Sequence, residues 1–504
     1  MSRTVVDLLH AGRGRFLVFL LLPLVTVAAY LPNSVRRSGW SDDFSLMESD
    51  DFAKFFADGR PVQGLLFEAV FPDNVSDLAV LRVIGVFGIA ALAVALALLL
   101  TGWGVSYLRA SVWSASAVFL PTFHEYAGWA TVFLHPWISL VGLLAGVLWI
   151  DGKQPRHRLR HGVAVLGMVL AMLAYPPAAM FCWVPLGLRI LVLRMRVSAA
   201  FREILRLGAL VGGAGLVSLL AAHVFRNLRG IPTDPRVQVI SSYEEIVEKI
   251  VWFVSHPVVV AARPFSIASP GVIEALATGG LVLATTATGI FVTSKGTVVS
   301  RLGVLFAIAV CSALTMAPHL LVPDNQIEYR FMGGLTVLVW GCACIAGSRL
   351  FQHGVGWLPV RVRSTVDSVW NRVPALCLTL LLPFVAFLAV TNVRNTFIDP
   401  SISKERFLLD ALSEYDPLVH GRVLIVNQFE FWQHRPNLGI YSTTSDLAHG
   451  WVAAPNVRLL LAESGRGHPP PDLLVVRVDV QPDPGDYIVD LRPYALSLSG
   501  SVSS

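Results

Sequence analysis

Residues 78–101 have the sequence LAVLRVIGVFGIAALAVALALLLT, in which Arg82 is the only ionisable side chain. The hydrocarbon core of a membrane is about 30 Å thick, and an α-helix needs about 20 apolar residues to cross it. The stretch therefore predicts a membrane-spanning helix, and the remainder of the chain can be examined for others.

Ten further apolar runs divide the chain into alternating spans and connections. Two of them are short and meet at Tyr175, Pro176 and Pro177; one kinked helix would fit, but we expect two tilted spans. The sequence thus predicts an all-α polytopic membrane protein with about 11 transmembrane helices. The predicted spans are 16–32, 78–101, 110–124, 127–150, 163–175, 177–193, 205–225, 270–293, 302–318, 331–348 and 373–393.

The composition of the 504 residues agrees with a membrane protein. Hydrophobic residues make up 54% and charged residues only 14%, and the mean hydropathy is +0.63. Soluble domains carry about 25% charged residues, so a soluble enzyme, a disordered protein and a nucleic-acid binder are excluded. All five cysteines lie in apolar runs, which argues against a disulfide framework and a CxxC metal site.

The basic residues indicate how the chain is oriented in the cell membrane. If the N-terminus is cytoplasmic, every inner connection is basic, and together they hold about half of the 39 lysines and arginines but few of the 34 acidic residues. This is the pattern of the positive-inside rule. The three large segments, 33–77, 226–269 and the C-terminal 394–504, then fall on the outer face. The first span could be a cleaved signal; we expect a retained anchor.

The C-terminal segment differs from the transmembrane part, 1–393. Residues 423–427, 473–478 and 487–491 favour short strands separated by turn-rich stretches. We expect 394–504 to form a small extracytoplasmic α/β domain with a disordered tail from Ser497.

The first outer connection contains the sequence GWSDDFSLMESDDFAKFFADGRP at residues 39–61. Ser41 is a favourable N-cap residue, and the acids after it suit a helix N-terminus. The aromatic residues recur at helical spacing, which predicts an amphipathic helix on the outer membrane surface that ends at Gly59 and Pro61. Asp43 and Asp50 would share a face about 10.5 Å apart, too far to share a proton, so one acid acting as a base is the more natural arrangement. In the alternative interpretation, these acids have no role in a reaction and are simply those that a solvent-exposed capping loop usually contains.

This pattern resembles the GtrII-type membrane glucosyltransferases, a GT-C-like group that modifies bacterial O-antigens and related surface glycans. The resemblance rests on Asp42 and Asp43 followed by 59–61 (Gly-Arg-Pro), and more weakly on 120–126 and 174–177. It covers roughly residues 16–350. The chain departs from the pattern at Leu46, where the family often has arginine, and in the additional pair Asp50 and Asp51.

The resemblance implies transfer of a hexose from a polyprenyl-phosphate donor to a glycan or glycolipid acceptor, with glucose as the first candidate for the hexose. The sequence agrees, because it contains neither a GxGxxG fingerprint nor a P-loop for a nucleotide. Such a reaction needs a carboxylate base and cations near the leaving phosphate. The predicted catalytic residues are Asp42 and Asp43; the predicted substrate-binding residues are Asp50, Asp51, Arg60, His124, Glu125, Tyr175, Arg263 and Arg330.

Two alternatives remain at this point. One is a GT-C mannosyl- or arabinosyltransferase of the cell envelope. The other is a transporter or lipid flippase without chemistry, which should show paired inverted halves with polar residues at mid-membrane; here the ionisable residues lie mainly at the ends of spans. The sequence demands no cofactor and leaves a divalent cation such as Mg²⁺ or Mn²⁺ open.

Overall fold

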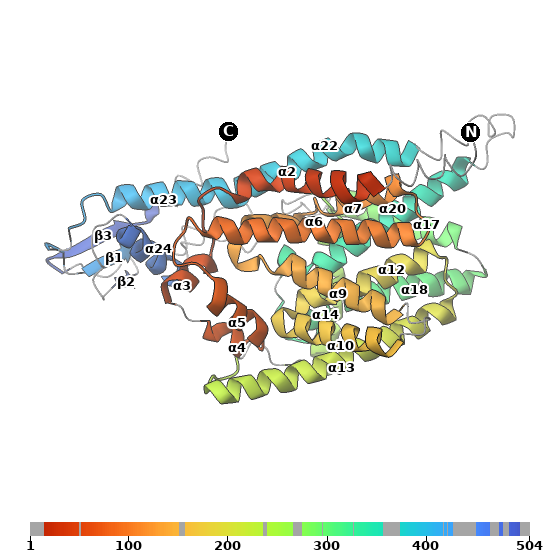
Figure 1. Cartoon of the computed structure of the whole chain (residues 1–504), viewed down its shortest axis with the longest axis horizontal. Coiled ribbons are helices and arrows are strands. Elements are labelled where there is room, and N and C mark those ends of the chain that lie inside the picture. Colours follow the sequence, from red (N-terminus) through yellow and green to blue (C-terminus); the bar gives the residue numbers. More distant parts are fainter. Residues whose placement is uncertain are drawn as a thin grey trace.

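The structure is a computed structural model of the whole chain (Figure 1). It describes residues 15–49, 52–150, 157–234, 239–265, 275–294, 296–325, 327–355, 373–416, 418–420, 422–426, 450–463, 473–476 and 483–493. The expected disordered tail lies outside these residues.

Helices dominate the described chain, and the long ones run side by side along the long axis of the molecule (Figure 1). Six are long and apolar enough to cross a membrane, judged by length and composition. Their apolar side chains face outward in many places, as lipid contact requires: Leu205, Leu219 and Leu380 are all more than 70% exposed. The six are Leu17–Ser34 (η1, Leu17–Leu21, and α2, Leu22–Ser34), Leu78–Gly102 (α6), Ala130–Ile150 (η2, Ala130–Val132, and α9, His135–Ile150), Val197–Arg229 (α13), Gly333–Gly354 (within α20, Gly333–Val355) and Leu376–Ala411 (within α22, Val373–Val393, η7, Arg394–Ile398, and α23, Asp399–Ala411).

The other predicted spans coincide with shorter or more polar helices, so the count of eleven stays a prediction. Three are apolar helices of 10 to 17 residues: Pro176–Val192, Ala277–Thr293 and Val298–Leu314. The third predicted span is divided, since α7 (Tyr107–Ala117) ends before Pro121 starts α8 (Pro121–Gly128). The remaining one is α10 (His157–Ala174).

The chain reverses at Tyr175, which favours two helices over one kinked helix at this point. Tyr175 has extended backbone angles after α10, and its ring stacks on His135 at the start of α9. The following segment, α11 (Pro176–Ala179) and η3 (Met180–Cys182), then runs back along α9. Gly142 and Gly146 permit this close approach, because a Cβ there would lie 2.5 Å from the carbonyl oxygen of Ala179 and 2.7 Å from that of Cys182.

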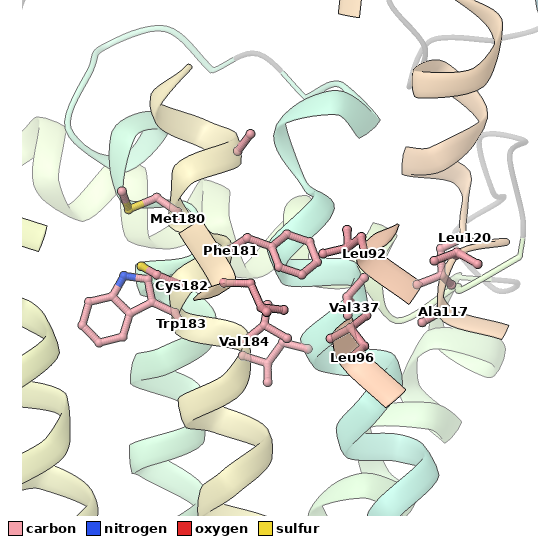
Figure 2. Close-up of a cluster of buried hydrophobic side chains, with 14 of the residues drawn as sticks. Leu92, Leu96, Ala117, Leu120, Met180, Phe181, Cys182, Trp183, Val184 and Val337 are labelled. Carbon is pink, nitrogen blue, oxygen red and sulfur yellow. The ribbon is translucent and has the colours of Figure 1, made fainter. Parts of the chain in front are cut away.

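The interior of the bundle is a continuous apolar core. Phe181 and Trp183, from η3 and the start of α12 (Trp183–Val192), extend from opposite sides of their segment, and Phe181 points toward Leu92 of α6 (Figure 2). Val337 of α20 joins the same cluster. The segment that follows the chain reversal at Tyr175 thus packs against α6 and α20 in this core.

The first outer connection is not the single surface helix that its spacing predicts. It forms α3 (Asp42–Ser49), α4 (Ala53–Ala57) and α5 (Pro61–Val70), and Pro61 starts a helix rather than ending one. Phe44, Phe52 and Phe55 are buried against Phe67 and the start of α6, so these aromatic side chains pack on protein and not on lipid. Ser41 has a φ of 45°, not the extended conformation typical of an N-cap residue.

In its described residues, the C-terminal part contains three parallel strands in the order β2-β1-β3. These strands, β1 (Arg422–Val426), β2 (Leu473–Val476) and β3 (Asp486–Asp490), lie where the sequence predicts them. Together with α23 (Asp399–Ala411) and α24 (Gly450–Glu463) they share a small apolar core. That this part is an independent domain on the outer side stays a prediction.

The C-terminal part packs against the first outer connection. The Ser401 hydroxyl donates to the Gly39 carbonyl at 2.8 Å, and the Gly39 N–H donates to Ser401 Oγ at 3.1 Å. The Lys404 ammonium lies 4.1 Å from the centre of the Phe44 ring, and α24 packs against α3. The C-terminal part therefore supports α3 at one end of the molecule (Figure 1).

Candidate functional site

A cavity of about 540 Å³ opens at the end of the bundle beside α3, α4 and α5. Four segments line it, and each belongs to or borders a connection predicted on the outer face. This volume is within the range of small-molecule sites. The lining residues are Asp42, Ser45, Lys54, Phe55, Asp58, Arg60, Gln63, Thr131, Val132, His135, Tyr175, Pro176, Pro177, Pro318, His319, Val322, Asp324, Arg330 and Phe331.

Asp42, in the first turn of α3, presents its carboxylate to this cavity. The side chain is 25% exposed, and Lys54 of α4 lies 3.1 Å from Oδ2. Burial alone would raise the pKa of Asp42, but the charges of Lys54, Arg330 and Arg60 outweigh it, and the pKa is lowered below its usual value. Asp42 is therefore ionised at neutral pH and accessible, as a base must be.

Asp43 is one residue away but lies in a different environment. It is fully buried, and it does not line the cavity. Its Oδ1 accepts hydrogen bonds from the N–H and hydroxyl of Thr131 at 2.8 and 2.6 Å, and its Oδ2 accepts one from the Trp40 N–H at 2.9 Å. Burial raises the pKa of Asp43, against these hydrogen bonds and the charge of Arg82. Asp43 thus ties α3 to the chain before α9.

Arg60 and Arg330 bring two guanidinium groups to the cavity from segments 270 positions apart in sequence. Arg60 pairs with Asp58 and lies over the ring of Tyr175 at 5.4 Å. Arg330, in η6 (Tyr329–Phe331), pairs with Glu328 and lies over Trp129 at 4.5 Å. Burial opposes the charge of Arg330, but the surrounding acids, first Glu328, raise its pKa. Both cations are held in position by acids and rings.

The cavity residues that were not among the predicted site residues include Lys54, His135 and His319. Lys54 is the partner of Asp42. His135 stacks on Tyr175 with ring centroids 3.8 Å apart, and His319 of α19 (Ala317–Leu320) lies 4.3 Å from the ring of Phe331. Burial lowers the pKa of His319 to about 3, so that its ring is neutral. An available signal was that Lys54 and His319 lie in predicted outer connections, whereas His135 lies within the predicted span 127–150.

The predicted residues divide into three groups. Asp42, Arg60, Tyr175 and Arg330 meet at the cavity. Asp50 and Asp51 lie outside the described residues. Asp43, His124, Glu125 and Arg263 are buried and do not line the cavity.

Two of the buried residues outside the cavity, His124 and Glu125, belong to α8. This helix packs against η6, which contains Arg330. His124 Nε2 lies 3.1 Å from the Phe119 carbonyl oxygen. Burial, helped by the charge of Glu328, raises the pKa of Glu125 well above its usual value. Burial therefore favours the neutral form of the Glu125 carboxyl group more than water would.

Among the described residues, no group of three or more His, Cys, Asp or Glu side chains is placed to hold a metal ion. In comparisons with known proteins, no family model matches the chain, and a search of the curated proteins found no match.

Proposed function

We propose that this protein is an integral-membrane glycosyltransferase of the GtrII-type, GT-C-like kind. It transfers a hexose from a polyprenyl-phosphate donor to a surface glycan or glycolipid on the outer face of the membrane. One observation carries the proposal: the ionised carboxylate of Asp42 shares a cavity with the guanidinium groups of Arg60 and Arg330. A base and two phosphate-binding cations are what this reaction requires.

In the proposed reaction, Asp42 accepts the proton of the acceptor hydroxyl. The hydroxyl oxygen forms a bond to the anomeric carbon of the sugar, and the bond from that carbon to the phosphate oxygen breaks. The polyprenyl phosphate leaves with the electron pair. The proton on Asp42 is then lost to water, which restores the carboxylate. The pairing with Lys54 at 3.1 Å supports this role because it keeps the carboxylate ionised between cycles.

The cations act on the departing phosphate. Arginine presents its donors in a planar fork that matches phosphate oxygens, and each guanidinium group carries five N–H donors. The aromatic rings beneath each guanidinium restrict its position, so the charge is in place before the negative charge develops.

The position of the cavity supports a lipid-linked donor. It lies at the end of the apolar bundle, where a carrier embedded in the membrane can bring its phosphate, and α14 (Tyr243–Ser255) stands beside it. Lys249 of α14 donates to the Asp324 carbonyl oxygen at 2.6 Å and to Asn325 Oδ1 at 2.7 Å. On the other face of α14, Ile250, Val251 and Val254 are exposed, which suits contact with lipid.

The test uses the full-length protein purified into lipid nanodiscs, supplied with radiolabelled polyprenyl-phosphate glucose or with the matching nucleotide sugar. We expect transfer from the lipid-linked sugar alone, and a mass loss of one hexose on an envelope glycan when the gene is deleted. Transfer from the nucleotide sugar without a lipid carrier would remove the lipid-linked donor from the proposal. An unchanged glycan profile with altered movement of a solute would favour a transporter instead.

A further inference from the structure

A second cavity, of about 680 Å³, lies at the opposite end of the bundle. The helix α13 connects the two ends: Arg226, near its C-terminus, donates to the Ala57 carbonyl oxygen beside the first cavity, whereas Val197, its first residue, lines the second. A helix of 33 residues rises about 50 Å. The second cavity is thus remote from the proposed reaction and has no role in it.

The walls of this second cavity are positively charged. They include three arginines and three serines (Arg194, Arg196, Arg349, Ser198, Ser294 and Ser300), and no acidic residue is among the lining residues in the described part of the chain. Arg349 is fixed by donating to the Val192 carbonyl oxygen at 3.0 Å. These three cations meet no acidic side chain among the described lining residues and repel one another, so an anion in the cavity would lower the energy of the arrangement.

Two helices also begin at this cavity. The first turn of α13 supplies Val197 and Ser198, and that of α18 (Val298–Leu314) supplies Ser300. The N-terminus of a helix carries a partial positive charge that favours phosphate. These two ends add to the potential of the three arginines and make phosphate the best-matched anion.

The surroundings of the cavity are apolar, which indicates the source of the phosphate. Leu191 and Val304 line its inner part. On the outside of α18, Val298, Val299 and Leu302 are 59%, 79% and 53% exposed, as expected of side chains that touch lipid. A ligand at this position would have a charged head and an apolar remainder.

We propose that this cavity binds the phosphate headgroup of an anionic phospholipid. Its lining comes from connections that the positive-inside rule assigns to the cytoplasmic side, where anionic lipids are enriched. The bound lipid fixes the start of α13 to α18 and α20 and stabilises the bundle at the end away from the first cavity.

The test measures the thermal unfolding midpoint of the full-length protein in neutral detergent. Short-chain phosphatidylglycerol, short-chain phosphatidylcholine and inorganic phosphate are titrated in separate arms. The test variant is Arg194→Gln with Arg196→Gln, since both side chains are exposed and their loss should not disturb folding. The matched control is Arg158→Gln, an exposed arginine on α10 that does not line the cavity.

We expect phosphatidylglycerol alone to raise the midpoint of the unchanged protein and of the control. The double variant should need about 100-fold more of this lipid, because each lost charge-assisted hydrogen bond weakens binding about tenfold. An equal response of the double variant would overturn the site. An equal response to phosphatidylcholine would overturn the requirement for an anion, and an equal response to inorganic phosphate would overturn the assignment to a lipid.

Discussion

Asp42 and Asp43 are adjacent in sequence, yet the geometry of the helix places their carboxylates in different environments. Successive residues of an α-helix point about 100° apart, so when one side chain faces the interior its neighbour faces elsewhere. The three hydrogen bonds to Asp43 use its oxygens for structure, whereas Asp42 keeps an exposed edge at the cavity. Of the two predicted catalytic residues, we therefore propose Asp42 as the base.

The pair can be separated by substitution. Asp42→Asn should reduce transfer by about 10²–10⁴-fold, the usual effect of losing a general base, and leave the thermal midpoint unchanged. Asp43→Asn should instead destabilise the protein by about 1–3 kcal/mol, because an amide NH₂ cannot accept the hydrogen bonds that the buried carboxylate accepts. Rates per folded molecule and unfolding curves distinguish the two, with Glu203→Gln at the far end as the control. An active Asp42→Asn protein would end the assignment of Asp42 as the base.

The neighbours of Asp42 should also determine the pH dependence. Because Lys54 lowers the pKa of Asp42, Lys54→Gln raises that pKa, and the base then becomes protonated at a higher pH. The acid limb of the kcat/KM profile should move upward in pH, while the rate at high pH changes less. An unmoved acid limb in Lys54→Gln would mean that another group is titrating.

At the scale of elements, the helices were predictable and the folded first connection was not. Apolar runs predict membrane helices because the hydrocarbon core of the membrane favours apolar side chains along the whole length of a spanning helix. The aromatic residues 44, 52 and 55 fit a surface helix equally well, since their spacing is the same whether lipid or protein covers them. Their actual partners, such as Phe67 and Phe133, are brought close only by tertiary folding.

The same reason explains the incomplete prediction of the site. The Asp-Asp pair and Arg60 stand in one short stretch and could be found there. Lys54 was visible in the sequence but had no evident role until the structure placed it against Asp42. His135 and His319 come from distant segments, and no pattern along the chain connects them to residue 42.

The packing of α9 on the reversal at Tyr175 can be tested at Gly142. A Cβ at this position would lie 2.5 Å from the Ala179 carbonyl oxygen, so Gly142→Ala should force the segment outward and cost about 1–3 kcal/mol. Gly212 of α13 has nothing within 4 Å of such a Cβ, and Gly212→Ala is the matched control. We expect a lower thermal midpoint only for Gly142→Ala; equal midpoints would contradict the close packing.

At the scale of the whole molecule, the two cavities divide the connections into two sets. The connections predicted outside, with the ends of the adjoining spans, supply the walls of the first cavity, and those predicted inside, with the ends of their spans, supply the walls of the second. This separation supports the alternation of the predicted spans without fixing their number. Because the two cavities are predicted on opposite sides of the membrane, the orientation can be tested by labelling one position near each cavity.

Single cysteines should report the orientation in intact cells, after the exposed Cys377 has been changed to alanine. Ser241→Cys lies before α14 near the first cavity, and Ser198→Cys lines the second; both positions are exposed. We expect a membrane-impermeant maleimide to label Ser241→Cys in intact cells and Ser198→Cys only after the membrane is opened. The reverse pattern would invert the orientation and place the proposed reaction in the cytoplasm.

The hydrogen bonds between Gly39 and Ser401 have a consequence for the biosynthesis of the protein. The two residues are 362 positions apart, and at about 5–20 residues per second the ribosome needs roughly 20–70 s to travel from one to the other. Throughout that time α3 lacks both this anchor and the later α24. A growing or prematurely ended chain therefore carries the residues of the first cavity without the support that fixes α3, and only a finished polypeptide has the complete site.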